Sequence, residues 1–357
     1  MIEQFEIVSS DSPRPNADRI IFCDGTCGRL FHPETDLELS HWRSNHTPSQ
    51  YRADTSTEIC FRFLDRPLSG QWSVAVNNHL DVDGILSVYV LIHSSHALAH
   101  RKSLIEAAEM GDFWGWGESV AQQVFQGLTH LMDERQQSGM DTKAIYAEAF
   151  QQIPSLIDGT HADCLEIDES LEPLRTGVEL VKSGEISRLV IDSRCSHYVL
   201  PMSVAAGDPT RALYIPDFNE AVSPKAILWP QVRARLDSER VCIVSVETDF
   251  GWYHDLWFPG YLWADIENRW TVPGMIFHDG METYDLNSPR LAEALENLQR
   301  HEAASGCWTL ANNTSPFHRK LPSVFPVVAR FVDEQGNPTP SRLTPQHIAG
   351  FFKGVFE

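Results

Sequence analysis

Residues 72–93, with the sequence WSVAVNNHLDVDGILSVYVLIH, are the segment that most constrains the fold of this chain. An apolar run of β-forming residues ends at two asparagines, and an apolar pattern of helical period begins after Gly84. The segment therefore predicts a strand, a tight loop and a helix, with His79, Asp81 and Asp83 on the loop. Open α/β sheets bind ligands at such strand ends. Carboxylate oxygens with one imidazole suit Mn²⁺ or Mg²⁺ better than a thiolate-binding metal.

The same loop has simpler interpretations, which stay open. Turns that contain Asp and Gly are common, Asp83 can cap the following helix, and Asp81 can be a solvated carboxylate. If the strand continued through the loop, its alternating side chains would place His79, Asp81 and Asp83 on one side. The preceding histidine and the context of strand and helix favour a metal site over a plain turn.

Composition and charge limit the classes of function. A chain of 357 residues that is 42% hydrophobic and 22% charged has the composition of a soluble globular protein with one large domain or two ordinary ones. The sequence contains no run of 18 or more apolar residues, so it does not indicate a membrane span. The first residues lack the features of a secretory signal. We therefore expect a cytoplasmic protein without a membrane partner.

The net charge of −21 limits the possible partners, and the spacing of the seven cysteines indicates the state of their thiols. Such a negative charge repels long phosphate backbones, so we do not expect duplex nucleic acid as a partner. A small anionic substrate held through metal ions is compatible with it, because the metal supplies local positive charge. The cysteines are scattered without the paired spacing of a zinc site, which is typical of reduced thiols.

Patterns along the chain predict an α/β protein. Residues 1–154 predict an α/β domain with a mostly parallel sheet and flanking helices, which carries the loop. Residues 155–357 predict a second α/β or α+β domain that could contribute to substrate binding. The main predicted helices are 119–137, 143–153, 288–304 and 345–356, with one more that Thr55 caps and Glu58 follows. The main predicted strands are 19–23, 188–191, 198–204, 211–215, 241–246, 307–311 and 327–332.

Three further residues share the pattern of the loop, because each follows or ends an apolar strand or helix. They are Asp24, His41 and Asp112. Taken singly, they can also be a turn residue, an edge histidine and a helix-terminal aspartate. Together with the three residues of the loop they could hold two divalent ions about 3.5–4 Å apart, as in two-metal hydrolases.

The segment NNHLDVDGILS resembles the first motif of the DHH phosphoesterase superfamily, in which a strand enters a His-x-Asp-x-Asp-Gly loop before a helix with a small residue, here Ser87. Members of that superfamily hydrolyse phosphodiester or phosphoanhydride bonds with Mn²⁺ or Mg²⁺. The resemblance implies that His79, Asp81 and Asp83 are metal ligands and catalytic residues. It covers this one short segment.

The rest of the chain departs from the superfamily pattern. The Asp-His-His triplet is absent, and the nearest segment is DLELSHW with His41, followed by a helix with Ser56 and Thr57. That segment precedes the first motif, so the order of motifs would be permuted. Asp24 and Asp112 would then stand for the isolated aspartates of the superfamily.

The glycine-rich substrate motif of many DHH members is also missing. Residues 312–323, NNTSPFHRKLPS, are the best substitute, with His318, Arg319 and Lys320 as ligands for the substrate's anionic group. A solvated basic loop is the alternative. The tryptophans of the second half predict a packed aromatic wall or, less simply, a surface for base stacking. They are Trp252, Trp257, Trp263 and Trp270.

Other motifs exclude common mechanisms. The segment IIFCDGT is similar to the first motif of haloacid-dehalogenase-type phosphatases, but Phe22 stands where the nucleophilic aspartate would be. Neither a phosphate-binding P-loop nor a G-x-G-x-x-G loop is present. We therefore expect a metal-dependent hydrolase of phosphoester or phosphoanhydride bonds in a small substrate, for example a nucleotide. The alternatives are a non-catalytic DHH-like binding or interaction protein, and a metal enzyme with different chemistry.

Overall fold

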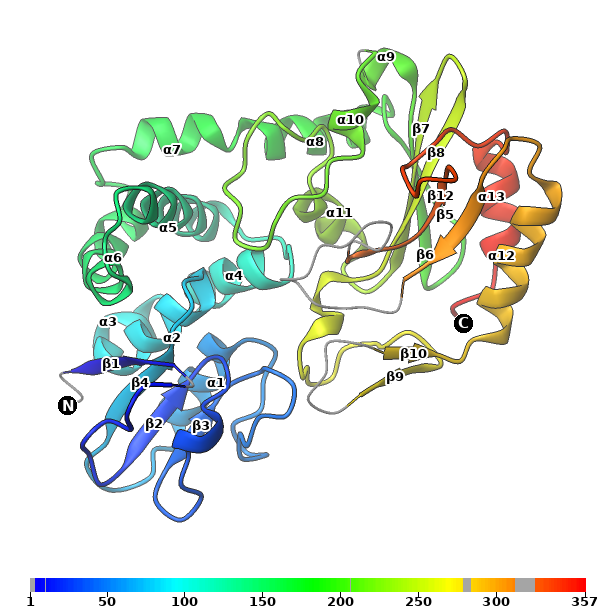
Figure 1. Ribbon diagram of the computed structural model, residues 1–357. Coiled ribbons are helices and arrows are strands. Elements are labelled where there is room, and N and C mark those ends of the chain that lie inside the picture. The colour runs from blue at the N-terminus through cyan, green and yellow to red at the C-terminus, as the bar shows by residue number, and fades with distance from the viewer. Residues whose placement is uncertain (1–3, 10, 206, 279–283, 312–324) are drawn as a thin grey trace. The chain divides into compact units, whose positions relative to one another are not determined.

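The computed structural model describes residues 4–9, 11–205, 207–278, 284–311 and 325–357 (Figure 1). The chain divides into two compact units. The first comprises Met1–Leu171, Phe218–Val222 and Ala264–Asn268, and the rest of the chain forms the second. The first unit thus continues past residue 154, where we expect a domain boundary, and it also contains two short segments from the second half of the chain.

The first unit contains a parallel sheet and seven α-helices among its described residues. The strands are β1 (Phe5–Val8), β2 (Ile20–Cys23), β3 (Leu37–Leu39) and β4 (Ser73–Asn77), and a 3₁₀ helix, η1, covers Gly28–Leu30. The helices are α1 (Ser56–Asp65), α2 (Val82–Ile92), α3 (Ser94–Ala99), α4 (Arg101–Asp112), α5 (Ser119–Gln137), α6 (Thr142–Ile157) and α7 (Cys164–Ser170).

The order of the strands in this sheet is β1-β4-β2-β3, and each neighbouring pair is parallel. The strand of the predicted loop, β4, therefore lies in the middle of the sheet between β1 and β2. All four residues of β2 are buried, as expected for a strand that is covered on both faces. Because the strands are parallel, the carboxyl ends of β2, β3 and β4 meet at one edge of the sheet.

Different elements cover the two faces of the sheet. Helices α1 and α2 pack against each other and against the strands (Figure 1). On the other side, Phe22 of β2 and Ala75 of β4 join an apolar cluster with Cys27 and Leu30 from the loop that follows β2. Helix α1 begins where its cap predicts, since the Thr55 hydroxyl accepts a hydrogen bond from the Glu58 amide.

The second unit is built on a mixed sheet of six strands in the order β11-β12-β8-β7-β6-β5. Only β6 and β7 are parallel in it. Its strands are β5 (Ser187–Val190), β6 (Cys195–Leu200), β7 (Val241–Thr248), β8 (Gly251–Trp257), β11 (Cys307–Leu310) and β12 (Val327–Val332). The strands β9 (Met275–Phe277) and β10 (Tyr284–Leu286) form a separate antiparallel pair.

The described residues of the second unit also form six α-helices, most of which contact the six-stranded sheet. They are α8 (Glu172–Ser183), α9 (Met202–Ala205), α10 (Pro209–Ala212), α11 (Pro230–Asp237), α12 (Pro289–His301) and α13 (Pro345–Phe352), with the 3₁₀ helix η2 (Gly260–Trp263). The α/β class expected for the chain is confirmed. The strand predicted over residues 211–215 is wrong, because Asp208 caps a short helix that begins at Pro209.

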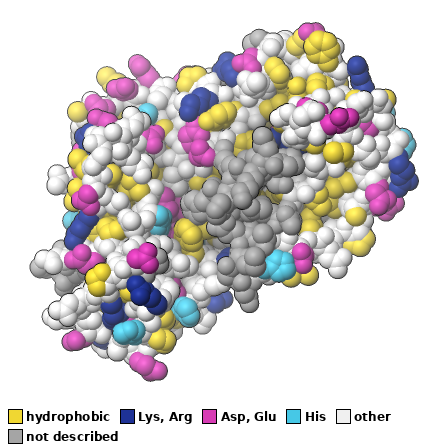
Figure 2. Space-filling view, viewed as in Figure 1, with side chains coloured by type: hydrophobic (Ala, Val, Ile, Leu, Met, Phe, Trp, Pro, Cys, Tyr) yellow, Lys and Arg dark blue, Asp and Glu magenta, His cyan; other side chains and the backbone are white. Residues whose placement is uncertain are grey.

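The described residues contain no helix whose length and apolar content would let it cross a bilayer. On the face of the molecule drawn in Figure 2, Lys and Arg side chains lie scattered among Asp and Glu side chains.

A buried chain of hydrogen bonds joins three neighbouring strands of the second unit. His197 Nε2 lies 2.6 Å from Ser245 Oγ, and Ser245 Oγ lies 2.6 Å from His254 Nδ1. The other ring nitrogen of His254 lies 3.0 Å from the Leu343 carbonyl, which can only accept. His254 therefore donates to Leu343, Ser245 donates to His254, and His197 donates to Ser245. Both rings are neutral, because burial lowers the pKa of His197 to about 3 and that of His254 to about 4.

We expect these two histidines to make the folded protein less stable as the pH falls from about 6.5 to 4. In this window the unfolded chain binds protons that the buried rings do not, so the free energy of unfolding decreases by up to about 1.4 kcal/mol per pH unit for each histidine. Urea unfolding at several pH values measures the slope. It should be shallower for His197→Gln/His254→Gln than for the wild type, and unchanged for the exposed control His301→Gln. Equal slopes in all three proteins would contradict this account.

Candidate metal centre

All six predicted ligands lie in one cluster at the carboxyl edge of the parallel sheet. They are Asp24, His41, His79, Asp81, Asp83 and Asp112. The ends of β2, β3 and β4 bring Asp24, His41 and His79 together, and helix α4 contributes its last residue, Asp112. These residues include two groups of three, and within each group the three ligand atoms lie within 4.8 Å of one another. Asp24 belongs to both groups. Buried carboxylate and imidazole groups in this arrangement could bind a metal.

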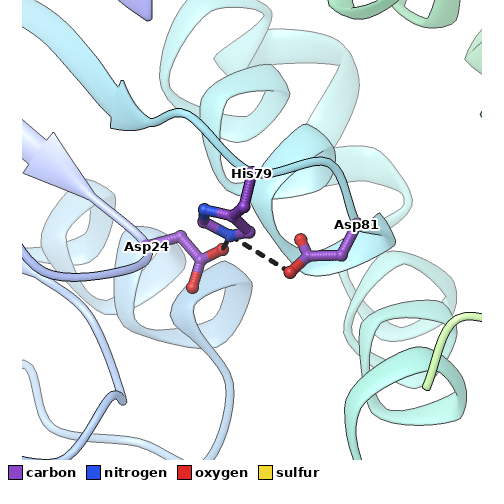
Figure 3. A group of neighbouring side chains, drawn as sticks. All are labelled: Asp24, His79 and Asp81. Atoms are coloured by element: carbon purple, nitrogen blue, oxygen red, sulfur yellow. Dashed lines mark hydrogen bonds and ion pairs between the residues drawn. The ribbon is translucent and has the colours of Figure 1, made fainter. Parts of the chain in front are cut away.

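The first group consists of Asp24, His79 and Asp81 (Figure 3). The Nε2 atom of His79 lies 2.6 Å from Oδ2 of Asp24 and 3.1 Å from Oδ2 of Asp81. The other oxygen of Asp81 accepts a hydrogen bond of 2.7 Å from the Gly84 amide, so Asp81 caps helix α2. Strand β4 ends at Asn77, before the loop. His79 and Asp81 therefore come together through loop geometry and not through an extended strand, and Asp83 lies in the first turn of α2.

The second group consists of Asp24, His41 and Asp83, with Asp112 beside it. The Nε2 atom of His41 lies 3.3 Å from Asp112, 3.5 Å from Asp83 and 3.9 Å from Asp24. The Nδ1 atom of His41 lies 2.7 Å from the carbonyl oxygen of Asp54, to which it donates. In the neutral ring this hydrogen bond leaves the lone pair on Nε2, which points toward the carboxylates. Metal-binding histidines are commonly oriented by such a bond.

Two side chains hold the shared carboxylate of Asp24. The indole N–H of Trp42 donates to Oδ1 over 3.1 Å, and the hydroxyl of Ser56 donates to the same oxygen over 2.9 Å. The other oxygen faces His79. Asp24 has a positive φ of 51°, which aspartate tolerates better than most residues, and this backbone turn follows directly after β2. The carboxylate therefore has a fixed direction between the two groups.

The N-terminus of helix α1 binds Asp83. The amides of Ser56 and Thr57 donate to its two oxygens, each over 2.8 Å. These amides are among the donors that a helix leaves without an internal partner, and the helix dipole favours an anion there. Asp83 thus accepts hydrogen bonds from another helix and does not cap its own. Each of its oxygens keeps a second lone pair for a further ligand.

The charges of the cluster shift its pKa values strongly. Burial opposes the charged form of His41, but Asp112, Asp83 and Asp24 outweigh it and raise the pKa to about 10. In the same way Asp81 and Asp24 raise the pKa of His79. Burial and neighbouring carboxylates raise the pKa of Asp112 to about 8. Protons on these groups limit the negative charge that the protein interior must hold, and a divalent cation would replace them.

Glycine at position 84 leaves space beside the carboxylates. A Cβ atom there would lie 2.9 Å from Oδ1 of Asp81, 3.0 Å from Oδ2 of Asp24 and 2.7 Å from the hydroxyl of Tyr146. Alanine is otherwise favoured over glycine inside a helix by about 1 kcal/mol. The Nδ1 atom of His79 is also buried without a hydrogen-bond partner among the described residues. Oxygen and imidazole donors around such a space could bind a metal ion.

Comparison with known proteins gives one match. A family model described as a family of unknown function, DUF6687, matches residues 4–187, just over half of the chain. The chain belongs to this family. No curated protein and no solved structure shows significant similarity to it.

All six residues of the candidate centre lie within the DUF6687 region. Asn219 lies outside this region and binds two parts of the centre. Its Oδ1 atom accepts a hydrogen bond of 2.9 Å from the Val82 amide, and its Nδ2 atom donates to Oδ1 of Asp112 over 3.2 Å. Asn219 belongs to one of the two segments of the second half that complete the first unit.

Sequence reasoning found the six residues of the candidate centre but missed the groups that orient four of them. These four are Asp24, His41, Asp83 and Asp112. Trp42, Asp54 and Asn219 carry no pattern that marks them, since each acts from a loop or through its backbone. Ser56 and Thr57 have a signal, because they follow the capping residue of a helix that begins near His41. The predicted anion ligands His318, Arg319 and Lys320 lie outside the described residues.

Proposed function

We propose that this chain is a divalent-metal-dependent hydrolase that cleaves phosphoester or phosphoanhydride bonds in a small substrate. The observation that carries the proposal is the convergence of five predicted ligands into two groups that share Asp24, with the sixth, Asp112, beside the second group. Two-metal phosphohydrolases need such a set of carboxylates and imidazoles from several strand ends. The resemblance of residues 77–87 to the first DHH motif supports the choice of phosphoester chemistry.

The residues of the candidate centre would have different roles. Asp24, His79 and Asp81 would hold one ion, and Asp24, His41, Asp83 and Asp112 a second. The ions would lower the pKa of an attacking water and neutralise the charge of the phosphoryl group. Trp42 and Ser56 keep the shared carboxylate in place, and Asp54 aims the His41 ring. Burial of the carboxylates strengthens their electrostatic effect on any cation.

Metal content and hydrolysis of the purified protein test this proposal. The protein is loaded with Mn²⁺ or Mg²⁺, and bound metal is measured by elemental mass spectrometry. Hydrolysis is assayed on phosphodiesters, phosphoanhydrides and unphosphorylated amides. We expect bound metal and phosphate-specific hydrolysis in the wild type, and a loss of both by at least about 10-fold in Asp81→Asn, as even substitutions beside metal ligands cost 10–100-fold.

The variant Asp81→Asn suits this test because asparagine keeps the oxygen that caps α2. Asp141→Asn is the matched control, since Asp141 caps α6 in the same way at an exposed position. The control should bind metal and hydrolyse substrate like the wild type. A wild type that takes up no divalent metal would contradict the proposal. Metal binding without phosphate hydrolysis would instead favour a binding protein, and turnover of amides alone would favour different metal chemistry.

A further inference from the structure

We propose that Asn219 is a positioning residue of the metal centre. Through it, the binding of a metal ion by His41, Asp83 and Asp112 depends on the position of residues 218–222. This inference rests on the proposed function, because it assumes that the centre binds metal. Asn219 belongs to the first unit although it lies far along the chain from the six ligands.

The side chain of Asn219 joins two elements that carry ligands. Its oxygen accepts from the amide of Val82, the first residue of α2, and its nitrogen donates to Asp112, the last residue of α4. The donated bond occupies Oδ1 of Asp112, while Oδ2 faces His41. Asn219 thus sets the rotation of the Asp112 carboxylate, and so the direction in which its second oxygen points.

The backbone around Asn219 is built for this contact. Its φ is 57°, a left-handed conformation that asparagine adopts more readily than most residues. Its own amide donates to the carbonyl of Gly111 over 3.2 Å, in the turn of α4 that ends at Asp112. A Cβ atom at Gly111 would lie only 2.3 Å from Oδ1 of Asn219, so glycine is needed there for the close approach.

A contact between two aromatic rings holds the same segment in position. Phe218 packs on Trp114 with 4.0 Å between the ring centroids, and Trp114 follows two residues after Asp112. Residues 217 and 223, on both sides of the segment, belong to the second unit. Along the chain, this segment of the first unit is therefore flanked on both sides by residues of the second unit. A displacement of residues 218–222 would break the hydrogen bond that Asn219 donates to Asp112. The group formed by His41, Asp83 and Asp112 would then bind a metal ion less tightly.

Asn219→Asp separates positioning from simple packing. Aspartate tolerates the left-handed backbone and keeps an oxygen for the Val82 amide. It replaces the donor to Asp112 with a carboxylate, which repels Asp112. Asn268→Asp is the matched control, because Asn268 also has a left-handed φ, of 61°, and lies exposed in the other segment that joins the first unit. Asn219→Gly, which keeps the backbone and removes both contacts, is the second variant.

The probe is Mn²⁺ alone, titrated into each protein with calorimetry and electron paramagnetic resonance. We expect two Mn²⁺ equivalents and a spin-coupled signal in the wild type and in Asn268→Asp. In Asn219→Asp one equivalent should weaken by about 10–100-fold, the range for residues that orient a metal ligand. The other equivalent should stay within about twofold, so that an uncoupled Mn²⁺ signal replaces the coupled one. Asn219→Gly should show the same selective loss.

The outcomes distinguish this inference from the function on which it rests. No Mn²⁺ binding by the wild type would remove the proposed function itself. Two tight equivalents in both Asn219 variants would overturn the inference and leave the proposed function standing. Equal weakening of both equivalents, with a lower melting temperature of the metal-free protein, would also overturn it, because a general structural role predicts that result.

Discussion

Asp24→Asn is expected to abolish metal binding and hydrolysis together. Asp24 is the one residue that both groups of ligand atoms share, so its loss weakens both. Substitutions of residues that merely orient a ligand cost about 10–100-fold in metal affinity, and we expect the loss of the shared carboxylate to exceed 100-fold. Calorimetric titration with Mn²⁺ and hydrolysis assays measure the two effects.

The stability of the metal-free variant shows whether this loss reflects misfolding. Asparagine can still accept the hydrogen bonds from Trp42 and Ser56, and it removes one negative charge from a cluster of buried carboxylates. Burial opposes the charged form of Asp24, but His79 and His41 outweigh it and lower its pKa to about 2, so the charged carboxylate stabilises the metal-free fold. The variant without metal should therefore still unfold in one cooperative transition, at a moderately lower melting temperature than the wild type. Asp18→Asn, an exposed position shortly before β2, is the control and should bind Mn²⁺ normally. Metal affinity within a few fold of wild type in Asp24→Asn would contradict the shared-ligand account.

The second large effect is expected in the sheet of the second unit. Asp255 on β8 and Arg330 on β12 lie opposite each other in register and form a two-pronged ion pair, with N–O distances of 3.0 and 2.6 Å. Both side chains are at most 5% exposed. Arg330→Met should lower the free energy of unfolding by about 3–5 kcal/mol, because it leaves the Asp255 carboxylate buried without this partner.

A double variant tests the physical reason. Arg330→Met/Asp255→Leu removes both charges, so it should recover most of the stability that the single variant loses. Urea unfolding of the wild type and both variants gives the comparison. Arg300→Met is the control, since Arg300 pairs with Glu296 on an exposed face of α12, and its effect should stay within about 0.5 kcal/mol. If the double variant were as unstable as the single one, packing and not charge would explain the loss.

The sequence was most informative where a local pattern determines structure. The loop from His79 to Asp83 follows an apolar strand and precedes an apolar helix, and such a change of period is visible in one short window. Helix α5 has the predicted limits, and β12 does too. The short helix α10 was missed, although the Asp208–Pro209 pair is a start signal for a helix.

Convergence of the ligands depends on the order of strands, which no local pattern contains. Strand β4 inserts between β1 and β2, and its pairing with β2 places its loop next to Asp24. Parallel strands made the prediction feasible, because their carboxyl ends meet at one edge wherever each strand lies. Asn219 had no such rule to mark it, since its place depends on the path of the chain through the second unit.

The two returning segments also set the order in which this protein can be completed during its synthesis. The first unit contains residues 218–222 and 264–268, and the amide of Asp265 binds the carbonyl of His41 over 2.7 Å. A ribosome that has finished residue 171 must add roughly 100 more before these contacts can form, which takes on the order of ten seconds. Until then the six ligands and most of the groups that orient them are already synthesised, while Asn219 and the Asp265 amide are missing. The nascent chain would therefore complete the candidate metal centre late, after roughly half of the second unit has been made.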